Sequence, residues 1–338
     1  MDFEPQANNL ILKVTASGDS KFSDLVSALM SDRATYKKRL IDHGVILFRG
    51  FEAKSSDDLM TLVTKGMGFK AWNTFNFLQL PTFLIDKIRR YSESLLGGGD
   101  YRIWLDKNSV QLGPADQGVQ GPHVEGGLST KRARFLVIGC FEAPKTFGET
   151  GVVDLEKCFS ELPDELKLKY RHASNLFSFA ALRKLTSIEK LFLKLTQFKV
   201  TTDTNVAKLN LPPCPLTLAV PETGKLCLQP WPFARNTADA VRAAAQVAFK
   251  DRGAIEIDRT SQDINLSWEL RDQNGQIINW THDDQVKLFT HIFTRAHLLR
   301  WQKGDVILVD NLRVGHFRMN GSNDRRLVQI QTESFSTV

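Results

Sequence analysis

The segment Trp301-Gln302-Lys303-Gly304-Asp305-Val306-Ile307-Leu308-Val309-Asp310-Asn311 decides the fold that this chain is expected to adopt. It contains a turn glycine, an unbroken apolar run and then a polar turn, which is the pattern of a strand buried within a sheet. Leu312-Arg313-Val314-Gly315-His316 follows directly, so the polar turn exposes His316. A β-rich core with a histidine beside the end of a strand is therefore predicted near the C-terminus.

A second signal, His123-Val124-Glu125, lies far upstream. Residues two apart in a strand point to the same face, so His123 and Glu125 can reach one cation. With His316 they form a 2-His-1-carboxylate set, which holds non-haem Fe(II) and leaves coordination positions open for oxygen chemistry. A lone His-x-Glu motif is weak evidence, and the downstream segment makes it specific. The histidines without a comparable setting are His43, His172, His282, His291 and His297.

Strand-like segments lie on both sides of a region with several helical patches. This order predicts an α+β chain with a mainly β core, namely a double-stranded β-helix (jelly roll) with flanking helices and a helical insertion. One domain is expected over residues 1–338. Its expected parts are an N-terminal α/β part at 1–100 that packs on the core, jelly-roll strands at 101–154 and 254–338, and a mostly helical insertion at 155–253.

The chain has 44 Lys and Arg against 38 Asp and Glu, a formal charge of +6. The basic residues are scattered in short groups, whereas a nucleic-acid binder concentrates them on one stripe with aromatic residues. The charge therefore disfavours a nucleic-acid partner and suits a small anionic substrate, which it would attract.

The first residues carry no signal-peptide pattern, and no apolar run is long enough to cross a bilayer. We therefore expect a cytoplasmic protein without a membrane partner. The four cysteines form no Cys-x-x-Cys pair and are too few for a disulfide scaffold, so reduced thiols are expected.

Five segments, in the same order, resemble the family of taurine/2-oxoglutarate dioxygenase-like enzymes, which includes clavaminate synthase. The resemblance covers most of the chain from Leu40 onward. No single segment is specific for the family, but five such segments in the family's order make a specific pattern. They are Gly44–Phe51 (the early family strand), His123–Glu125 (His-x-Asp/Glu), Phe147–Gly151 (the Gly-Gly-Asp-Thr turn), Trp301–Asn311 (Trp-x-x-Gly-Asp…Asp-Asn), and His316 with Arg325-Arg326.

The resemblance implies that His123, Glu125 and His316 hold Fe(II), and that 2-oxoglutarate and O₂ are the cosubstrates. It further implies that Thr150 and Arg326 bind the distal carboxylate of 2-oxoglutarate. Arg326 is preferred to Arg325 because strand alternation groups it with Val328 and Ile330. Arg318 stays a competing partner, since the turn before Arg326 is slightly short for the family.

The resemblance also implies oxidation of a C–H bond by hydroxylation, desaturation or oxidative cyclisation, with release of succinate and CO₂. Family members that act on sulfonates carry an arginine four residues after the oxoglutarate arginine, where this chain has Ile330, so taurine is disfavoured. A small, carboxylate-bearing, amino-acid-derived substrate is expected instead. Its candidate anchors are Arg132, Arg134, Arg318 and Arg325.

Three other functions stay open at this stage. One is an oxygenase that acts on a protein or nucleic acid, which only the +6 charge supports. Another is a non-enzymatic β-sandwich binding module, in which the histidines are incidental. The third is a zinc hydrolase, since the same ligands can hold zinc with an open position. The sequence makes no prediction of the oligomeric state.

Overall fold

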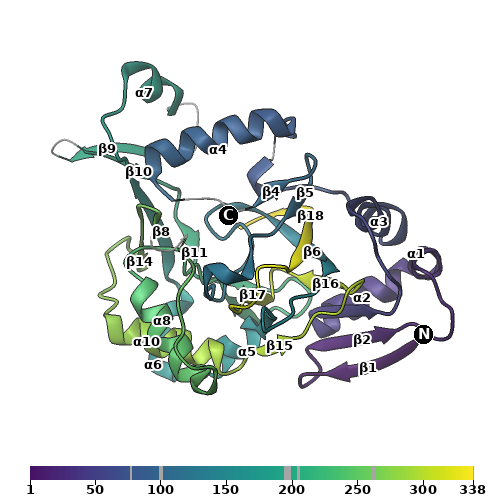
Figure 1. The fold of residues 1–338 in the computed structure, drawn as a ribbon. Helices are drawn as coiled ribbons and strands as arrows, with labels where there is room; N and C mark the ends of the chain where they lie inside the picture. The colour runs from purple at the N-terminus through teal and green to yellow at the C-terminus, as the bar shows by residue number, and fades with distance from the viewer. Residues whose placement is uncertain (77, 99–101, 194–198, 204–205, 260–262, 338) are drawn as a thin grey trace.

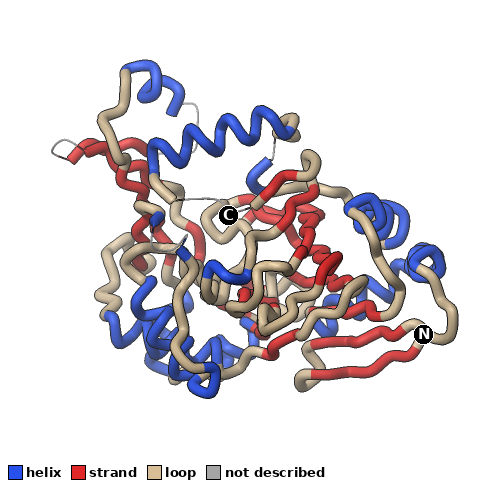
Figure 2. The backbone as a smooth tube through the Cα atoms, viewed as in Figure 1, coloured by secondary structure: helices blue, strands red, loops and turns tan. Residues whose placement is uncertain are grey.

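The computed structural model describes residues 1–76, 78–98, 102–193, 199–203, 206–259 and 263–337. Most strands lie in the middle of the molecule, whereas the two nearest the N-terminus reach its edge, and most helices lie toward the outside (Figure 2). The largest sheet has eight strands, all paired antiparallel except β2 with β3. In sheet order these are β1 (Asp2–Gln6), β2 (Ile11–Thr15), β3 (Val45–Arg49), β16 (Val306–Asp310), β6 (Lys131–Glu142), β18 (Arg326–Ser336), β5 (Ser109–Gln111) and β4 (Ile103–Trp104).

The strand predicted from the apolar run near the C-terminus is confirmed as β16. It lies between β3 and β6, and all five of its residues are buried. A strand that is covered on both faces needs apolar residues at consecutive positions, which explains the unbroken run. Val306 and Leu308 pack on one side of the sheet, and Ile307 and Val309 on the other.

A three-stranded sheet faces the large one. Its order is β15 (His297–Leu299), β7 (Thr150–Asp154) and β17 (Val314–Arg318). One hydrophobic cluster joins the two sheets, since Leu47 and Ile138 of the large sheet pack with Val152 of β7 and Val314 of β17. The two sheets therefore enclose a common interior, and β17 brings His316 to it.

The helices of the N-terminal part cover the other face of the large sheet. They are α1 (Phe22–Ser31), α2 (Arg33–His43) and α3 (Ser56–Thr61), followed by a π-helical turn at Leu62–Gly66. Leu25, Leu29 and Leu59 from these helices pack against Phe48 of β3 and Val137 of β6. Helices α1, α2 and α3 therefore pack on the sheet that contains β16.

The predicted insertion at 155–253 contains a sheet as well as helices, so the expectation of a mostly helical segment is wrong. Its helices are α5 (Leu155–Ser160), α6 (Asp164–Arg171), α7 (Ser187–Leu193) and α8 (Ala238–Ala248). Its strands are β8 (Ser174–Ala180), β9 (Lys199–Asp203), β10 (Val206–Asn210) and β11 (Cys214–Pro215), with the hairpin β12 (Thr217–Ala219) and β13 (Leu226–Leu228). The β9–β10 hairpin and β11 form one sheet with β8 through pairings between segments that are distant in the sequence.

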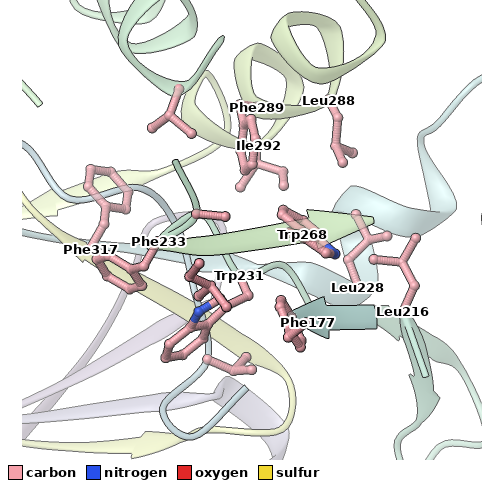
Figure 3. Close-up of a cluster of buried hydrophobic side chains, with 14 of the residues drawn as sticks. Phe177, Leu216, Leu228, Trp231, Phe233, Trp268, Leu288, Phe289, Ile292 and Phe317 are labelled. Carbon is pink, nitrogen blue, oxygen red and sulfur yellow. The ribbon is translucent and has the colours of Figure 1, made fainter. Parts of the chain in front are cut away.

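The insertion joins the rest of the chain through a large hydrophobic cluster. Strand β14 (Leu266–Arg271) pairs with β8, and helix α10 (His282–Phe293) packs against α8. Figure 3 shows Trp268 of β14 between Phe177 of β8 and Phe289 of α10. The same cluster includes Phe317 of β17, so the core of the insertion reaches the strand that carries His316.

Helix α4 (Thr82–Leu96) lies along the outside of the molecule, near α7 and the β9–β10 hairpin (Figure 1). Only Ile85 and Leu95 are buried within it. The four cysteines are buried and unpaired. Among the described residues, no helix combines the length and the apolar character that crossing a bilayer requires.

Gly151 of β7 lies opposite Phe317 of β17, and a Cβ at Gly151 would overlap the ring of Phe317. We expect Gly151→Ala to lower the free energy of unfolding by about 1–3 kcal/mol, which is the usual cost of overpacking. Urea denaturation followed by circular dichroism measures this change. The double variant Gly151→Ala/Phe317→Leu should lose less stability than the sum of the two single changes. Additive losses would contradict this close packing.

Candidate metal centre

Three buried side chains that are distant in sequence converge on one point. His123, Glu125 and His316 each offer a ligand atom, and these atoms all lie within 4.8 Å of one another. The His316 Nε2 atom is 3.9 Å from Glu125 Oε2, and the two imidazole ring centroids are 4.4 Å apart. The sequence predicted that these three side chains form a metal site, and the structure brings them together.

The backbones of the two histidines hold each other in place. The His123 N–H donates to the His316 carbonyl at 3.0 Å, and the His316 N–H donates to the His123 carbonyl at 2.9 Å. The sequence predicted a strand over His123–Glu125. The structure has only an isolated bridge at His123, and a turn begins at Glu125. Pairing with β17 nevertheless holds the backbone of His123 beside that of His316.

Asn311 positions Glu125 through its backbone. The Asn311 side-chain oxygen accepts from the Glu125 N–H at 2.7 Å, and the Asn311 amide donates to the Glu125 carbonyl at 3.1 Å. Asn311 follows β16 directly and is itself buried. The polar turn that ends the predicted strand therefore holds the turn that carries the carboxylate.

Both histidines are suited to act as neutral ligands. Burial lowers the pKa of His123, and burial together with His123 lowers the pKa of His316 well below its ordinary value. His123 Nδ1 donates to the Gly121 carbonyl at 2.9 Å, which leaves the Nε2 lone pair available. His316 Nδ1 is buried and has no hydrogen-bond partner among the described residues. The other ring nitrogen, Nε2, faces the buried carboxylate of Glu125 at 3.9 Å. Two neutral imidazoles and a carboxylate that meet in this way fit an ion that accepts imidazole lone pairs, as Fe(II) does.

The three side chains line a cavity of about 420 Å³. Trp231 and Phe233 pack edge-on against the His123 ring, with ring centroids 5.9 and 4.6 Å away. Both aromatic residues belong to the large hydrophobic cluster, where they lie near Phe317 (Figure 3). The metal ligands therefore have apolar surroundings on one side.

The choice of Arg326 over Arg325 is corrected by the structure. Arg326 is exposed, pairs with Glu142 at 3.3 Å and does not line the cavity. Arg325 is buried and lines the cavity. Alternation grouped Arg326 correctly with Val328 and Ile330, but that face of β18 packs against the N-terminal helices.

Arg325 brings a positive charge into the cavity without a carboxylate partner among the described residues. Its guanidinium donates to the Gly148 carbonyl at 3.0 Å and to the Gly113 carbonyl at 3.3 Å, and its Nε has no partner there. Burial, and then the neighbouring Arg318, lower the pKa of Arg325 to about 9, so it stays charged at neutral pH. A buried cation with only carbonyl partners favours the binding of an anion beside it.

Thr150 and Arg318 also line the cavity, as the sequence predicted. Thr150 accepts a hydrogen bond from Trp301 Nε1 at 2.9 Å, which leaves its hydroxyl proton free to donate. Arg318 forms a buried ion pair with Asp258. Because Asp258 neutralises Arg318, Arg325 is the better partner for an incoming carboxylate.

Arg132 and Arg134 do not line the cavity, so their expected role as substrate anchors is not supported. Arg132 donates to the Gly127 carbonyl at 2.9 Å and to the Gln229 side chain at 2.8 Å. Arg134 pairs with Asp310 at 2.8 Å. Both arginines hold neighbouring segments of the fold together.

Sequence reasoning gave no role to two polar residues of the cavity that lie beside Glu125. Arg102 Nη1 lies 3.4 Å from Glu125 Oε1, and Gln329 Nε2 lies 3.4 Å from Glu125 Oε2. Gln329 lies four residues after Arg325, so strand alternation places both side chains on the same face of β18. A polar residue on that face could have indicated that Gln329 lines the cavity. No local pattern marked Arg102, which follows the glycine-rich sequence Gly97-Gly98-Gly99-Asp100-Tyr101.

We expect acid to destabilise the metal-free protein. The folded-state pKa values of His123 and His316 are lowered, so the unfolded chain takes up protons first as the pH falls through about 6.5. Stability is intact above this pH, and roughly 1 kcal/mol per histidine is lost between pH 6.5 and 5.5. Urea unfolding at both pH values measures the loss. His316→Asn should show a smaller loss, and a loss equal to that of the unchanged protein would contradict the assignment.

No protein-family profile and no curated protein matches this chain. Solved structures do match. PvcB from Pseudomonas aeruginosa is similar over 95% of this chain and 85% of its own, with 14% identity and a TM-score of 0.54. AAD-2 in complex with Mn(II) and N-oxalylglycine is similar over 100% and 99%, with 12% identity and a TM-score of 0.54.

A putative α-ketoglutarate-dependent taurine dioxygenase from Burkholderia xenovorans is also similar, over 99% of this chain and 94% of its own. Its identity is 12% and its TM-score 0.54. PvcB is described as an Fe, α-ketoglutarate-dependent oxygenase from an isonitrile synthetic pathway. These similarities span nearly the whole length of the chains. This chain therefore has the fold of these iron- and 2-oxoglutarate-dependent oxygenases, as the five sequence segments predicted.

Proposed function

We propose that this chain is an Fe(II)- and 2-oxoglutarate-dependent oxygenase that activates a C–H bond of a small, carboxylate-bearing substrate. One observation carries the proposal: two neutral imidazoles, one carboxylate and the unneutralised guanidinium of Arg325 line the same buried cavity. A metal-binding set alone would also suit a hydrolase. A buried cation beside the set favours a cosubstrate that carries a second anionic group.

In this proposal His123, Glu125 and His316 would hold the iron in the cavity that they line. Bound Fe(II), with 2-oxoglutarate and O₂, supplies oxidation of the substrate C–H bond and yields succinate and CO₂. Hydroxylation is the proposed outcome. The chain itself keeps the imidazoles neutral by burial and orients Glu125 through Asn311.

Arg325 and Thr150 bind the distal carboxylate of 2-oxoglutarate. The guanidinium offers a planar, charged donor group, and the Thr150 hydroxyl can add one hydrogen bond. Arg325 donates to the Gly148 carbonyl, two residues before Thr150, so both donors come from the same corner of the cavity. The α-ketoglutarate dependence of PvcB and the complex of AAD-2 with N-oxalylglycine support such a cosubstrate.

With Arg325 as the oxoglutarate arginine, the fourth residue after it is Gln329 rather than Ile330. Gln329 lines the cavity but carries no charge. The family pattern for sulfonates places an arginine there. The proposed substrate is therefore a different acid from taurine, in agreement with the expectation from the sequence.

Removing the charge of Arg325 should weaken 2-oxoglutarate binding selectively. We expect Arg325→Met to raise the KM for 2-oxoglutarate by roughly 30-fold or more, because truncating a buried charged partner costs at least about 2 kcal/mol. The variant should stay folded, since it loses an unneutralised buried charge. Succinate release by the iron-loaded protein measures the effect. Arg326→Met is the matched control, and an equal effect of both changes would contradict the assignment.

His123→Ala should abolish high-affinity metal binding, because it removes one of only three proposed protein ligands. Electron paramagnetic resonance of added Mn(II) and succinate release by the iron-loaded protein report binding and turnover separately. His297→Ala, which changes a histidine outside the cavity, is the control. Retained metal binding and turnover in His123→Ala would refute the proposed centre. Turnover without O₂ would indicate a hydrolase instead.

A further inference from the structure

An arginine of the insertion pairs with a buried acid beside the corner of the cavity that holds Arg325. Arg252 ends a short 3₁₀ helix (Lys250–Arg252) that follows α8. Its Nη1 and Nη2 atoms donate to the two carboxylate oxygens of Glu149 at 3.0 and 2.8 Å. The Glu149 side chain is 3% exposed and that of Arg252 is 17% exposed. A fork of two charge-assisted hydrogen bonds fixes orientation as well as distance, so Arg252 holds the segment that leads into β7.

This segment has a left-handed backbone at two consecutive residues. The φ angles of Phe147 and Gly148 are 48° and 70°. Glycine adopts such angles freely, whereas they strain a phenylalanine and persist only where surrounding contacts hold them. The Arg252 guanidinium lies over the Phe147 ring, 4.6 Å from its centroid, while it pairs with Glu149. One side chain of the insertion therefore contacts the residues on both sides of Gly148.

The carbonyl between these two contacts is a partner of Arg325. Arg325 Nη1 donates to the Gly148 carbonyl at 3.0 Å, and its Nη2 donates to the Gly113 carbonyl at 3.3 Å. Neither Arg252 nor Glu149 lines the cavity. The pair can therefore affect a ligand only through its neighbours, and the Gly148 carbonyl connects it to Arg325.

Loss of the fork would leave the Glu149 carboxylate buried without a close cation. Arg300 also lies near it, but the Arg300 Nε atom is 4.0 Å from Glu149 Oε1 and the Arg300 side chain is 87% exposed. A buried carboxylate that loses its partner moves toward water, because desolvation of an unpaired charge is unfavourable. Such a movement of Glu149 would shift the neighbouring Gly148 carbonyl, and Arg325 would lose its nearer partner.

We propose that Arg252 is a positioning residue for the 2-oxoglutarate site. It holds the segment 147–149, whose Gly148 carbonyl orients Arg325. This inference rests on the proposed function and extends it to a residue of the insertion. None of the five segments that resemble the dioxygenase family contains Arg252, and no pattern in the sequence pointed to it.

The test uses the full chain with Mn(II) and N-oxalylglycine, which has the length and charges of 2-oxoglutarate. Electron paramagnetic resonance measures Mn(II) binding, and isothermal titration calorimetry measures N-oxalylglycine binding to the Mn(II)-loaded protein. The main variant is Arg252→Lys. It keeps a cation beside Glu149, so the buried carboxylate stays paired, but a lysine cannot form the planar fork. Thermal unfolding verifies that each variant is folded.

We expect Arg252→Lys to bind Mn(II) as tightly as the unchanged protein does. It should bind N-oxalylglycine roughly 10-fold more weakly, which is the scale of effect when a residue that orients a ligand group is changed. The KM for 2-oxoglutarate should rise by a similar factor, while kcat at saturating 2-oxoglutarate stays the same. The double variant Arg252→Gln/Glu149→Gln, which removes both charges of the pair, should behave in the same way.

Two comparisons separate positioning from a general loss of structure. Arg300→Gln is the matched control, because it changes the exposed arginine beside the same carboxylate and should alter neither binding nor KM. The double variant Arg252→Lys/Arg325→Met should bind N-oxalylglycine about as weakly as Arg325→Met alone. The two losses are not additive in this case, because the effect of Arg252 passes through Arg325.

The possible outcomes are distinct. If Mn(II) and N-oxalylglycine fail to bind to the unchanged protein, the proposed function fails and the role of Arg252 fails with it. If they bind equally well to the unchanged protein and to Arg252→Lys, the role of Arg252 is overturned and the function stands. An equal effect of Arg300→Gln, additive losses with Arg325→Met, or weaker Mn(II) binding to Arg252→Lys would also overturn this role.

Discussion

The pair of reciprocal backbone hydrogen bonds between His123 and His316 is the contact on which the candidate site depends. It connects a turn that belongs to no named strand with β17 of the smaller sheet. Backbone groups cannot shift without leaving buried donors unsatisfied, so this contact sets the distance between the two imidazoles more firmly than side-chain packing could. Asn311 then adds Glu125 to the same arrangement, and the end of β16 supports Asn311.

The electrostatics of the cavity follow from burial. Two histidines are held neutral, Arg318 is neutralised by Asp258, and Arg325 keeps its charge with only carbonyl partners. Opposite charges attract more strongly where water is excluded. The cavity thus combines two neutral imidazoles, a carboxylate and an unneutralised guanidinium, and Trp231 and Phe233 pack against it on one side.

Local patterns in the sequence predicted the metal set, because His-x-Glu spacing, an apolar run and a polar turn each act over a few residues. The sequence favoured Arg326, which lies outside the cavity, for a physical reason. Alternation shows which residues share a face, but both faces of β18 are buried, and only the tertiary structure shows which one meets the cavity. The sheet of the insertion was missed because its strands β9, β10 and β11 are short, and β10 and β11 join one sheet only by pairing with β8, which is distant from them in the sequence. Arg102 reaches Glu125 through contacts that no local pattern records.

The position of α4 has a consequence for how this protein can change over generations. The helix forms part of the cavity wall but buries only Ile85 and Leu95, so most substitutions on it leave the hydrophobic clusters intact. Trp231 and Phe233, by contrast, belong to the largest cluster. Substitutions on α4 therefore cost little stability and can change which ligands the cavity accepts. Substitutions at Trp231 or Phe233 disturb the core and are selected against.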